Sequence, residues 1–429
     1  MKRALILLSF LLPVSLLFLS CGSTPSSSGG GGSGLKFRAF ISQDVNAGNV
    51  AAGVQIIDAE KDARAFVAPI SAGATPGLMV VTPNRVQTLV FSPADNKLTF
   101  ISNGGEGASA QITLPGFTES FVVSPDSLTA YVAVPTAPVV AQPPGLLEVV
   151  NLNSGAITAG INVPAVRFLA IGHSGNRLLA FSDNSNSAAV ISFGTGNPTV
   201  TFVDGFDRPV AAFFSADDNT AYVVNCGAEC GGLQASVQTL DLTSNTAGVP
   251  VGVCTADAVP ICAASVAVVD GTTMYLAGTP VPNPDPLPCT GQTTAATSCG
   301  LLTVFDLTSM TVTSSGIVIT DGYHNRIALG ANGQLFVGAK TCTEIIPPIP
   351  PPPDAEVRGC LSIYDTQTGA VVIPPANGDV TGIEPISNRN VVYLVQGGEL
   401  QIYDTTTDKL QKTQIDISGR VVDVKTVDF

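Results

Sequence analysis

Hydrophobic and polar residues alternate along this chain with the short period of β-strands. Short runs rich in Val, Ile, Phe, Tyr and Thr are separated by Gly, Asn, Asp and Pro, the residues that form turns. No long stretch has its apolar residues spaced at the helical period. The pattern therefore predicts an all-β protein.

A unit of strands recurs along the chain. Its first half is an apolar strand, a polar turn and a second strand, as at 120–134, 211–225, 266–278 and 327–339. Its second half is a strand ending in an acidic or polar turn, followed by an outer strand, as at 54–67, 146–161, 302–319, 361–373 and 400–415. Four short strands in a unit of about 40 to 60 residues are typical of a β-propeller blade.

Three of these segments resemble the YVTN-type β-propeller repeat family. They are SPDSLTAYVAV (124–134), SADDNTAYVVN (215–225) and IYDTQTGAVV (363–372). The resemblance covers residues 36–429 and implies a secreted or surface protein. The ring of that family typically has seven blades.

Counting units gives eight blades instead. The predicted blades are 36–76, 77–118, 119–166, 167–207, 208–262, 263–322, 323–378 and 379–419. The first unit lacks an inner strand, and the extra C-terminal strand at 420–429 can supply it and close the ring. Seven blades remain the alternative if the weak units 77–118 and 167–207 are wrongly divided.

The N-terminus predicts a bacterial lipoprotein. Lys2 and Arg3 precede an apolar run that is short for a membrane span, so residues 1–20 are interpreted as a signal peptide. The run ends in LFLSCGS, which resembles a lipobox with Cys21 as the lipidated residue, although Phe18 and Leu19 depart from the pattern. An ordinary signal peptide is the alternative. Gly22 favours outer-membrane sorting, on the periplasmic or the outer side, and residues 21–35 form a Gly/Ser-rich tether before the propeller at 36–429.

Composition excludes several classes of function. The formal charge of −14 argues against a nucleic-acid partner, because phosphate contacts require clusters of Lys and Arg. Two His residues leave little scope for imidazole metal sites or histidine catalysis. No catalytic motif of a known type is found, and we predict no catalytic residues, no metal and no cofactor.

Eight cysteines remain after Cys21, an even number in a chain sent to an oxidising compartment. Each pair of cysteines that are neighbours in the sequence falls between the second and third strands of a unit, or between one unit and the next. These connections emerge on one face of a propeller, so local disulfides are predicted on that face. Metal binding is the disfavoured alternative, because the spacings do not match thiolate zinc sites. The predicted pairs are Cys226–Cys230, Cys254–Cys262, Cys289–Cys299 and Cys342–Cys360.

The longest of these loops, 341–360, contains six prolines between Pro347 and Pro353. Proline cannot extend a central strand, so a stiff polyproline II segment is expected there. A group of charged residues precedes or opens inner strands on the same face. These residues are Glu119, Arg167, Arg208, His324 and Arg326. They are a candidate rim that binds a small anionic ligand. The alternative is that they are solvated rim residues without a ligand.

Three functions are compatible with these features. The first is a non-catalytic binding or scaffold module, anchored in the outer membrane by its N-terminal lipid, whose disulfide-bearing loops meet a protein or small ligand. The second is a lactonase-like hydrolase with a site at the channel mouth, implied by some relatives of the YVTN-type repeat. The third is a structural envelope protein without a specific ligand.

Overall fold

The computed structural model describes residues 32–44, 51–194, 196–254, 262–280, 299–344, 357–411, 414–417 and 419–428. The chain divides into two units, Met1–Gly31 and Gly32–Phe429, and the second contains every described residue. The signal peptide, Cys21 and most of the tether therefore lie outside the described residues. Within those residues, no helix is long and apolar enough to cross a membrane.

Eight antiparallel sheets form the second unit, and together they make a β-propeller. Blade 1 contains β1 (Arg38–Asp44), β2 (Gly53–Asp58), β3 (Ala63–Arg64) and β33 (Arg420–Thr426), and blade 2 contains β4 (Met79–Val81), β5 (Gln87–Ser92), β6 (Lys97–Ser102) and β7 (Gly107–Thr113). Blade 3 contains β8 (Phe121–Val123), β9 (Thr129–Val134), β10 (Leu146–Asn151) and β11 (Ala156–Asn162), and blade 4 contains β12 (Val166–Ile171), β13 (Arg177–Ser182), β14 (Ser187–Ser192) and β15 (Thr199–Asp204).

Blade 5 contains β16 (Pro209–Phe214), β17 (Thr220–Asn225), β18 (Ser236–Asp241), β19 (Thr246–Ala247) and β20 (Val251–Gly252). Blade 6 contains β21 (Val266–Asp270), β22 (Thr273–Gly278), β23 (Gly300–Asp306) and β24 (Thr311–Ile319). Blade 7 contains β25 (Tyr323–Leu329), β26 (Gln334–Lys340), β27 (Leu361–Asp365) and β28 (Val371–Val372). Blade 8 contains β29 (Val380–Pro385), β30 (Val391–Gln396), β31 (Glu399–Asp404) and β32 (Lys409–Leu410).

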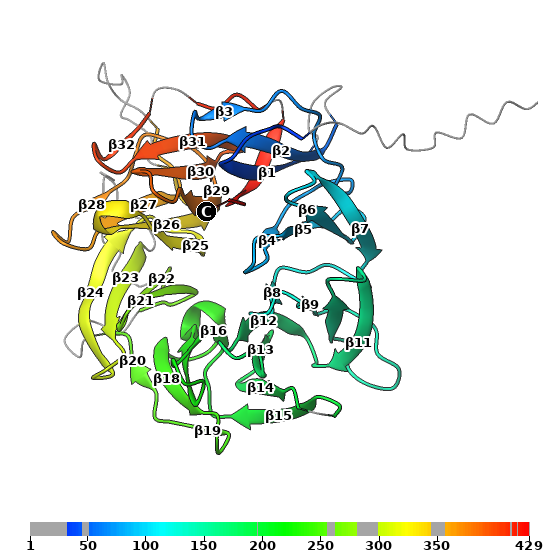
Figure 1. Cartoon of the computed structure of the whole chain (residues 1–429). Coiled ribbons are helices and arrows are strands. Elements are labelled where there is room, and N and C mark those ends of the chain that lie inside the picture. Colours follow the sequence, from blue (N-terminus) through cyan, green and yellow to red (C-terminus); the bar gives the residue numbers. More distant parts are fainter. Residues whose placement is uncertain are drawn as a thin grey trace, which may run out of the picture. The chain divides into compact units, whose positions relative to one another are not determined.

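The predicted division into eight blades is confirmed. Figure 1 shows the sheets in a ring, with the inner strands β4, β8, β12, β16, β25 and β29 nearest its centre. The two weak units, 77–118 and 167–207, each form a complete four-stranded sheet, so the seven-blade alternative is wrong. The one boundary that differs is minor: β12 begins at Val166, one residue before the predicted start.

Acidic or amide side chains at the end of the third strand form the turn to the outer strand. In blade 5, Asp241 Oδ1 accepts hydrogen bonds from the backbone amides of Thr243 and Ser244, at 2.7 and 3.0 Å. Such a side chain replaces the backbone acceptors that a tight turn leaves unavailable. This local chemistry explains why the acidic turn recurs in the sequence. The same arrangement occurs at Asp58, Asn151, Asp306, Asp365 and Asp404.

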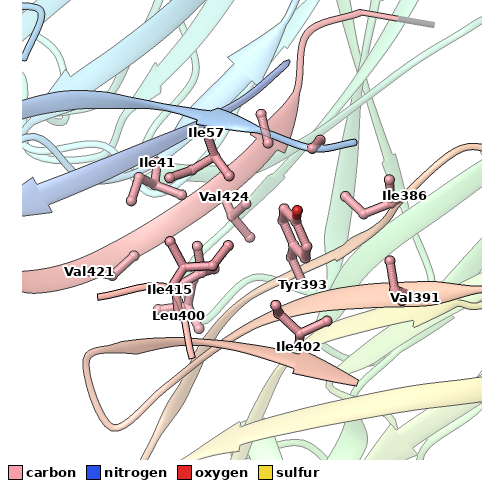
Figure 2. Packing of buried hydrophobic residues seen from close by; sticks show 13 residues of the cluster. Ile41, Ile57, Ile386, Val391, Tyr393, Leu400, Ile402, Ile415, Val421 and Val424 are labelled. Carbon is pink, nitrogen blue, oxygen red and sulfur yellow. The ribbon is translucent and has the colours of Figure 1, made fainter. Parts of the chain in front are cut away.

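The C-terminal strand closes the ring, as the sequence predicts. β33 pairs antiparallel with β1, so the last strand of the chain is the inner strand of the first blade. A buried cluster then forms between blades 1 and 8, where Tyr393 of β30 packs among Ile41, Val421 and Val424. Figure 2 shows Tyr393 standing between the strands of blade 8 and those of blade 1.

Polar contacts reinforce the same closure. The Tyr393 hydroxyl donates to Asp62 Oδ1 at 2.5 Å, and Arg389 pairs with the same carboxylate at 2.6 Å. On the other side of blade 1, the Arg38 guanidinium lies 2.7 Å from both Asp428 and Glu106. Blade 1 is thus tied to blade 8, to blade 2 and to its own C-terminal strand.

The closure leads to a prediction for β33. Val424 is fully buried in the cluster between blades 1 and 8, whereas Val422 on the same strand is half-buried. Val424→Ala leaves a cavity and is expected to lower the free energy of unfolding by about 2 kcal/mol. The midpoint of urea unfolding measures this loss. Val422→Ala is the matched control, and an equal shift in both variants would contradict the assigned role of Val424.

Candidate binding site at the ring axis

Three of the four predicted disulfides are present in the described residues. Their Cα–Cα distances are 5.7 Å for Cys226–Cys230, 5.8 Å for Cys254–Cys262 and 5.4 Å for Cys342–Cys360. Cys299 is also disulfide-bonded, while its predicted partner Cys289 lies outside the described residues. The six cysteines of these three pairs thus serve as local cross-links, and the pairing of Cys299 with Cys289 stays a prediction.

These disulfides share one face of the propeller. Cys226–Cys230 lies between β17 and β18, Cys342–Cys360 lies between β26 and β27, and Cys254–Cys262 joins blade 5 to blade 6. In a blade of antiparallel strands, connections from the second to the third strand emerge on the same face as those to the next blade. We call this face, in blades 5 to 7, the disulfide face.

The base of the longest loop is held by hydrogen bonds. The Thr343 amide and hydroxyl each donate to the Asp321 carboxylate at 2.7 Å, and the Thr341 amide donates to Asp379 at 2.7 Å. The proline run lies outside the described residues, so its polyproline II conformation stays a prediction. The loop therefore leaves the propeller from a fixed base.

A pocket of about 330 Å³ opens near the ring axis on the disulfide face. We call it the mouth pocket. Its walls come from four consecutive blades. Residues at the starts of β12, β16 and β25 meet Ser265, just before β21, and residues from the loops after β13 and β17. Its principal side chains are Arg167, Phe168, Asp183, Arg208, Glu229 and Tyr323.

Arg167 is neutralised by two carboxylates. Its guanidinium lies 2.6 Å from Glu119 and 2.9 Å from Asp183, and its central carbon lies 5.1 Å from the ring centre of Phe168. All three partners come from blades 3 and 4. Two residues of the predicted rim, Glu119 and Arg167, therefore form an ion pair with each other.

Arg208 lies in the same pocket with few partners. Its Nη2 donates to the Gly231 carbonyl at a long 3.4 Å, while its Nε is buried without a hydrogen-bond partner among the described residues. Its φ of 58° is left-handed, a conformation that costs free energy for a non-glycine residue. The surrounding structure thus holds this guanidinium beside the pocket.

Glu229 is a pocket residue that the sequence analysis did not identify. It lies in the short 3₁₀ helix Gly227–Cys230, inside the Cys226–Cys230 disulfide loop. Burial raises its pKa to about 7, and hydrogen bonding from the Thr279 backbone and the Ser265 side chain offsets part of that rise. The signal for this residue was a lone Glu within a tight disulfide loop.

His324 is not a rim residue, contrary to the prediction. Its side chain is fully buried, and its Nδ1 lies 3.5 Å from the Thr279 hydroxyl of the neighbouring blade. Burial lowers its pKa to about 4, which keeps the ring neutral. The reason is the alternation along β25, which exposes Tyr323 and buries the next side chain. The second histidine, His173, is exposed in the β12–β13 turn.

Arg326 and Lys340 are two further charged residues near the axis. Arg326 Nε donates to the Thr381 carbonyl of blade 8 at 2.8 Å. Burial and the nearby charge of Arg326 lower the pKa of Lys340, while Glu119 and Asp379 act in the opposite direction. The charge of Glu119, in blade 3, thus acts on the pKa of a lysine in blade 7. Across the described residues, no group of three or more His, Cys, Asp or Glu side chains is arranged to hold a metal ion.

Comparison with known proteins identifies the fold. No family model matches this sequence. No curated protein matches it either. Solved structures that resemble it include dihydro-heme d1 dehydrogenase NirN in complex with DHE (TM-score 0.61, 13% identity, 92% of this chain and 75% of that chain). Another is apo AztD from Citrobacter koseri, with a TM-score of 0.56 and 11% identity over 91% of this chain and 97% of that chain. A third is Kuenenia stuttgartiensis hydrazine synthase, with a TM-score of 0.54 and 12% identity over 80% of this chain and 96% of that chain.

The Glu229 carboxyl leads to a prediction for pH dependence. Because the pKa is raised in the folded state, the folded protein still holds the Glu229 proton above pH 4.5, where the unfolded chain has released it. The stability contributed by this carboxyl is therefore complete below pH 4.5 and is lost as pH rises through 7. Relative to Glu229→Gln, the native protein should lose about 3 kcal/mol of unfolding free energy between pH 4.5 and 7.

Urea unfolding of both proteins at several pH values measures this difference. The lowered pKa of His324 acts in the opposite direction, but it is common to both proteins and cancels in the comparison. Parallel stability profiles for the two proteins would show that Glu229 is not buried as described.

Proposed function

We propose that this protein is a non-catalytic binding module whose disulfide face meets a partner. The observation that supports this most strongly is the coincidence of two features on one face. The disulfide-closed loops of blades 5 to 7 lie on the same face as a pocket that four blades build, and one of them, Cys226–Cys230, lines it. Cross-linked loops on a rigid scaffold lose little conformational entropy when they bind.

The proposal includes attachment to the outer membrane. The lipobox-like sequence before Cys21, Gly22 after it, and the Gly/Ser-rich tether support a lipid anchor with the propeller held at a flexible distance. Membership of the YVTN-type repeat family is part of the same proposal. The eight blades differ from the seven that are typical of that family.

A hydrolase is the second candidate, and Glu229 is the observation that favours it. A carboxyl group with a pKa of about 7 in a pocket has the acidity that a general base requires at neutral pH. Lactone hydrolysis by the native protein that is lost in Glu229→Gln would favour this candidate over the binding module.

The anchor is tested by Cys21→Ser. The native protein should incorporate a palmitate analogue during growth and remain in the membrane fraction, because the lipid is attached to the thiol. The variant should lose the label and leave the membrane fraction. A native protein that is unlabelled and soluble would contradict the anchor but not the binding module.

The partner is tested by crosslinking in intact cells that make the protein. A photoreactive amino acid at Leu233, which is 90% exposed on the disulfide face, should yield one specific adduct. The control position is Ala216, exposed in the β16–β17 turn on the opposite face. The adduct should weaken when Cys342 and Cys360 are both replaced by Ser. Equal crosslinking from the two faces would overturn the proposal.

A further inference from the structure

We infer that the mouth pocket binds a small carboxylate with an apolar body, and that the Arg208 guanidinium holds the carboxylate. This inference deepens the proposed binding function and rests on it. It names a ligand class for one site on the disulfide face, and it does not involve the lipid anchor or the proline-rich loop.

Charge around the axis is the first argument. Arg167 is compensated by Glu119 and Asp183. Within the described ranges, Arg208, Arg326 and Lys340 form no ion pair, although the chain as a whole has a formal charge of −14. Cations without an ion-pair partner in an acidic protein produce a local field that attracts an anion, and Arg208 is the one of these three that lines the mouth pocket.

Hydrogen-bonding capacity is the second argument. A guanidinium carries five N–H donors in a planar fork that matches a carboxylate. Arg208 uses this fork for a single long contact, and its Nε is buried without a partner in the described part of the chain. The terminal guanidinium nitrogens make no other hydrogen bond in the described part of the chain, so they can donate to a bound carboxylate.

The apolar surface beside Arg208 is the third argument. Phe168 and Val210 line the pocket and are half-buried, and Tyr323 exposes 41% of its surface. Further along the axis, apolar residues of β12, β21 and β25 are also half-buried, including Leu169, Val266 and Ile327. An apolar body attached to the carboxylate would cover this surface.

The size and remaining charges of the pocket define the ligand. A volume of about 330 Å³ is at the lower end of the range for small-molecule sites. A phosphate dianion would meet Asp183 in the pocket and Glu119 beside it, with Arg208 as the one uncompensated guanidinium of the pocket. A monoanionic carboxylate needs no second cation, and the raised pKa of Glu229 reduces the repulsion from this carboxyl at pH 6.

The test uses the mature native protein at pH 6, with phenylpropanoate, its amide phenylpropanamide and inorganic phosphate as probes. Titration calorimetry should detect phenylpropanoate but neither the amide nor phosphate. Arg208→Gln should raise the Kd about tenfold or more, because a hydrogen-bonded charge pair is lost. Arg208→Lys, which keeps the charge without the planar fork, should give an intermediate Kd.

Arg64→Gln is the matched control, since Arg64 is exposed on the outer strand of blade 1. Its Kd should equal that of the native protein, and the urea midpoints of all variants should agree. Four results would each overturn the inference. They are equal binding of the carboxylate and the amide, preferential binding of phosphate, no binding of any probe, and native affinity in Arg208→Gln. Crosslinking from Leu233 that persists in such a case would leave the proposed function intact.

Discussion

The antiparallel pairing of β33 with β1 is the interaction on which the rest of the propeller depends. It joins strands that are almost 400 residues apart, from Ala39 opposite Thr426 to Asp44 opposite Arg420. Without β33, the cluster containing Tyr393 would lose Val421 and Val424 and would face water. β1 would then be an unpaired edge strand, and blade 1 would lose the inner strand that packs against blade 8.

Closure of the ring also creates the pocket. Arg167, Arg208 and Tyr323 come from blades 4, 5 and 7, and they meet because a closed ring brings the starts of their inner strands together. The Cys226–Cys230 disulfide closes the short turn that adds Glu229 to this group. The face that carries the cross-links is therefore also the face on which the pocket opens.

Most of the architecture could be predicted because its determinants are local. Each blade is encoded by alternating strands and by turn residues such as Asp241, whose side chain bonds amides two and three positions ahead. The disulfides could be paired because each connects neighbours within one loop. The burial of His324 could not be predicted, because a shift of one residue along β25 exchanges the exposed and buried sides of the strand. Glu229 was missed because its hydrogen-bond partners, Ser265 and Thr279, belong to the next blade.

Hydrogen exchange measured by mass spectrometry, with and without phenylpropanoate, tests the central claim most directly. The account predicts slower exchange in the segments that form the mouth pocket, namely the start of β12, the start of β16 and the Cys226–Cys230 loop. Exchange in the β12–β13 and β16–β17 turns, on the opposite face, should not change. Protection on the opposite face, or none at the pocket while the ligand is bound, would contradict a binding site built by four blades at the ring axis.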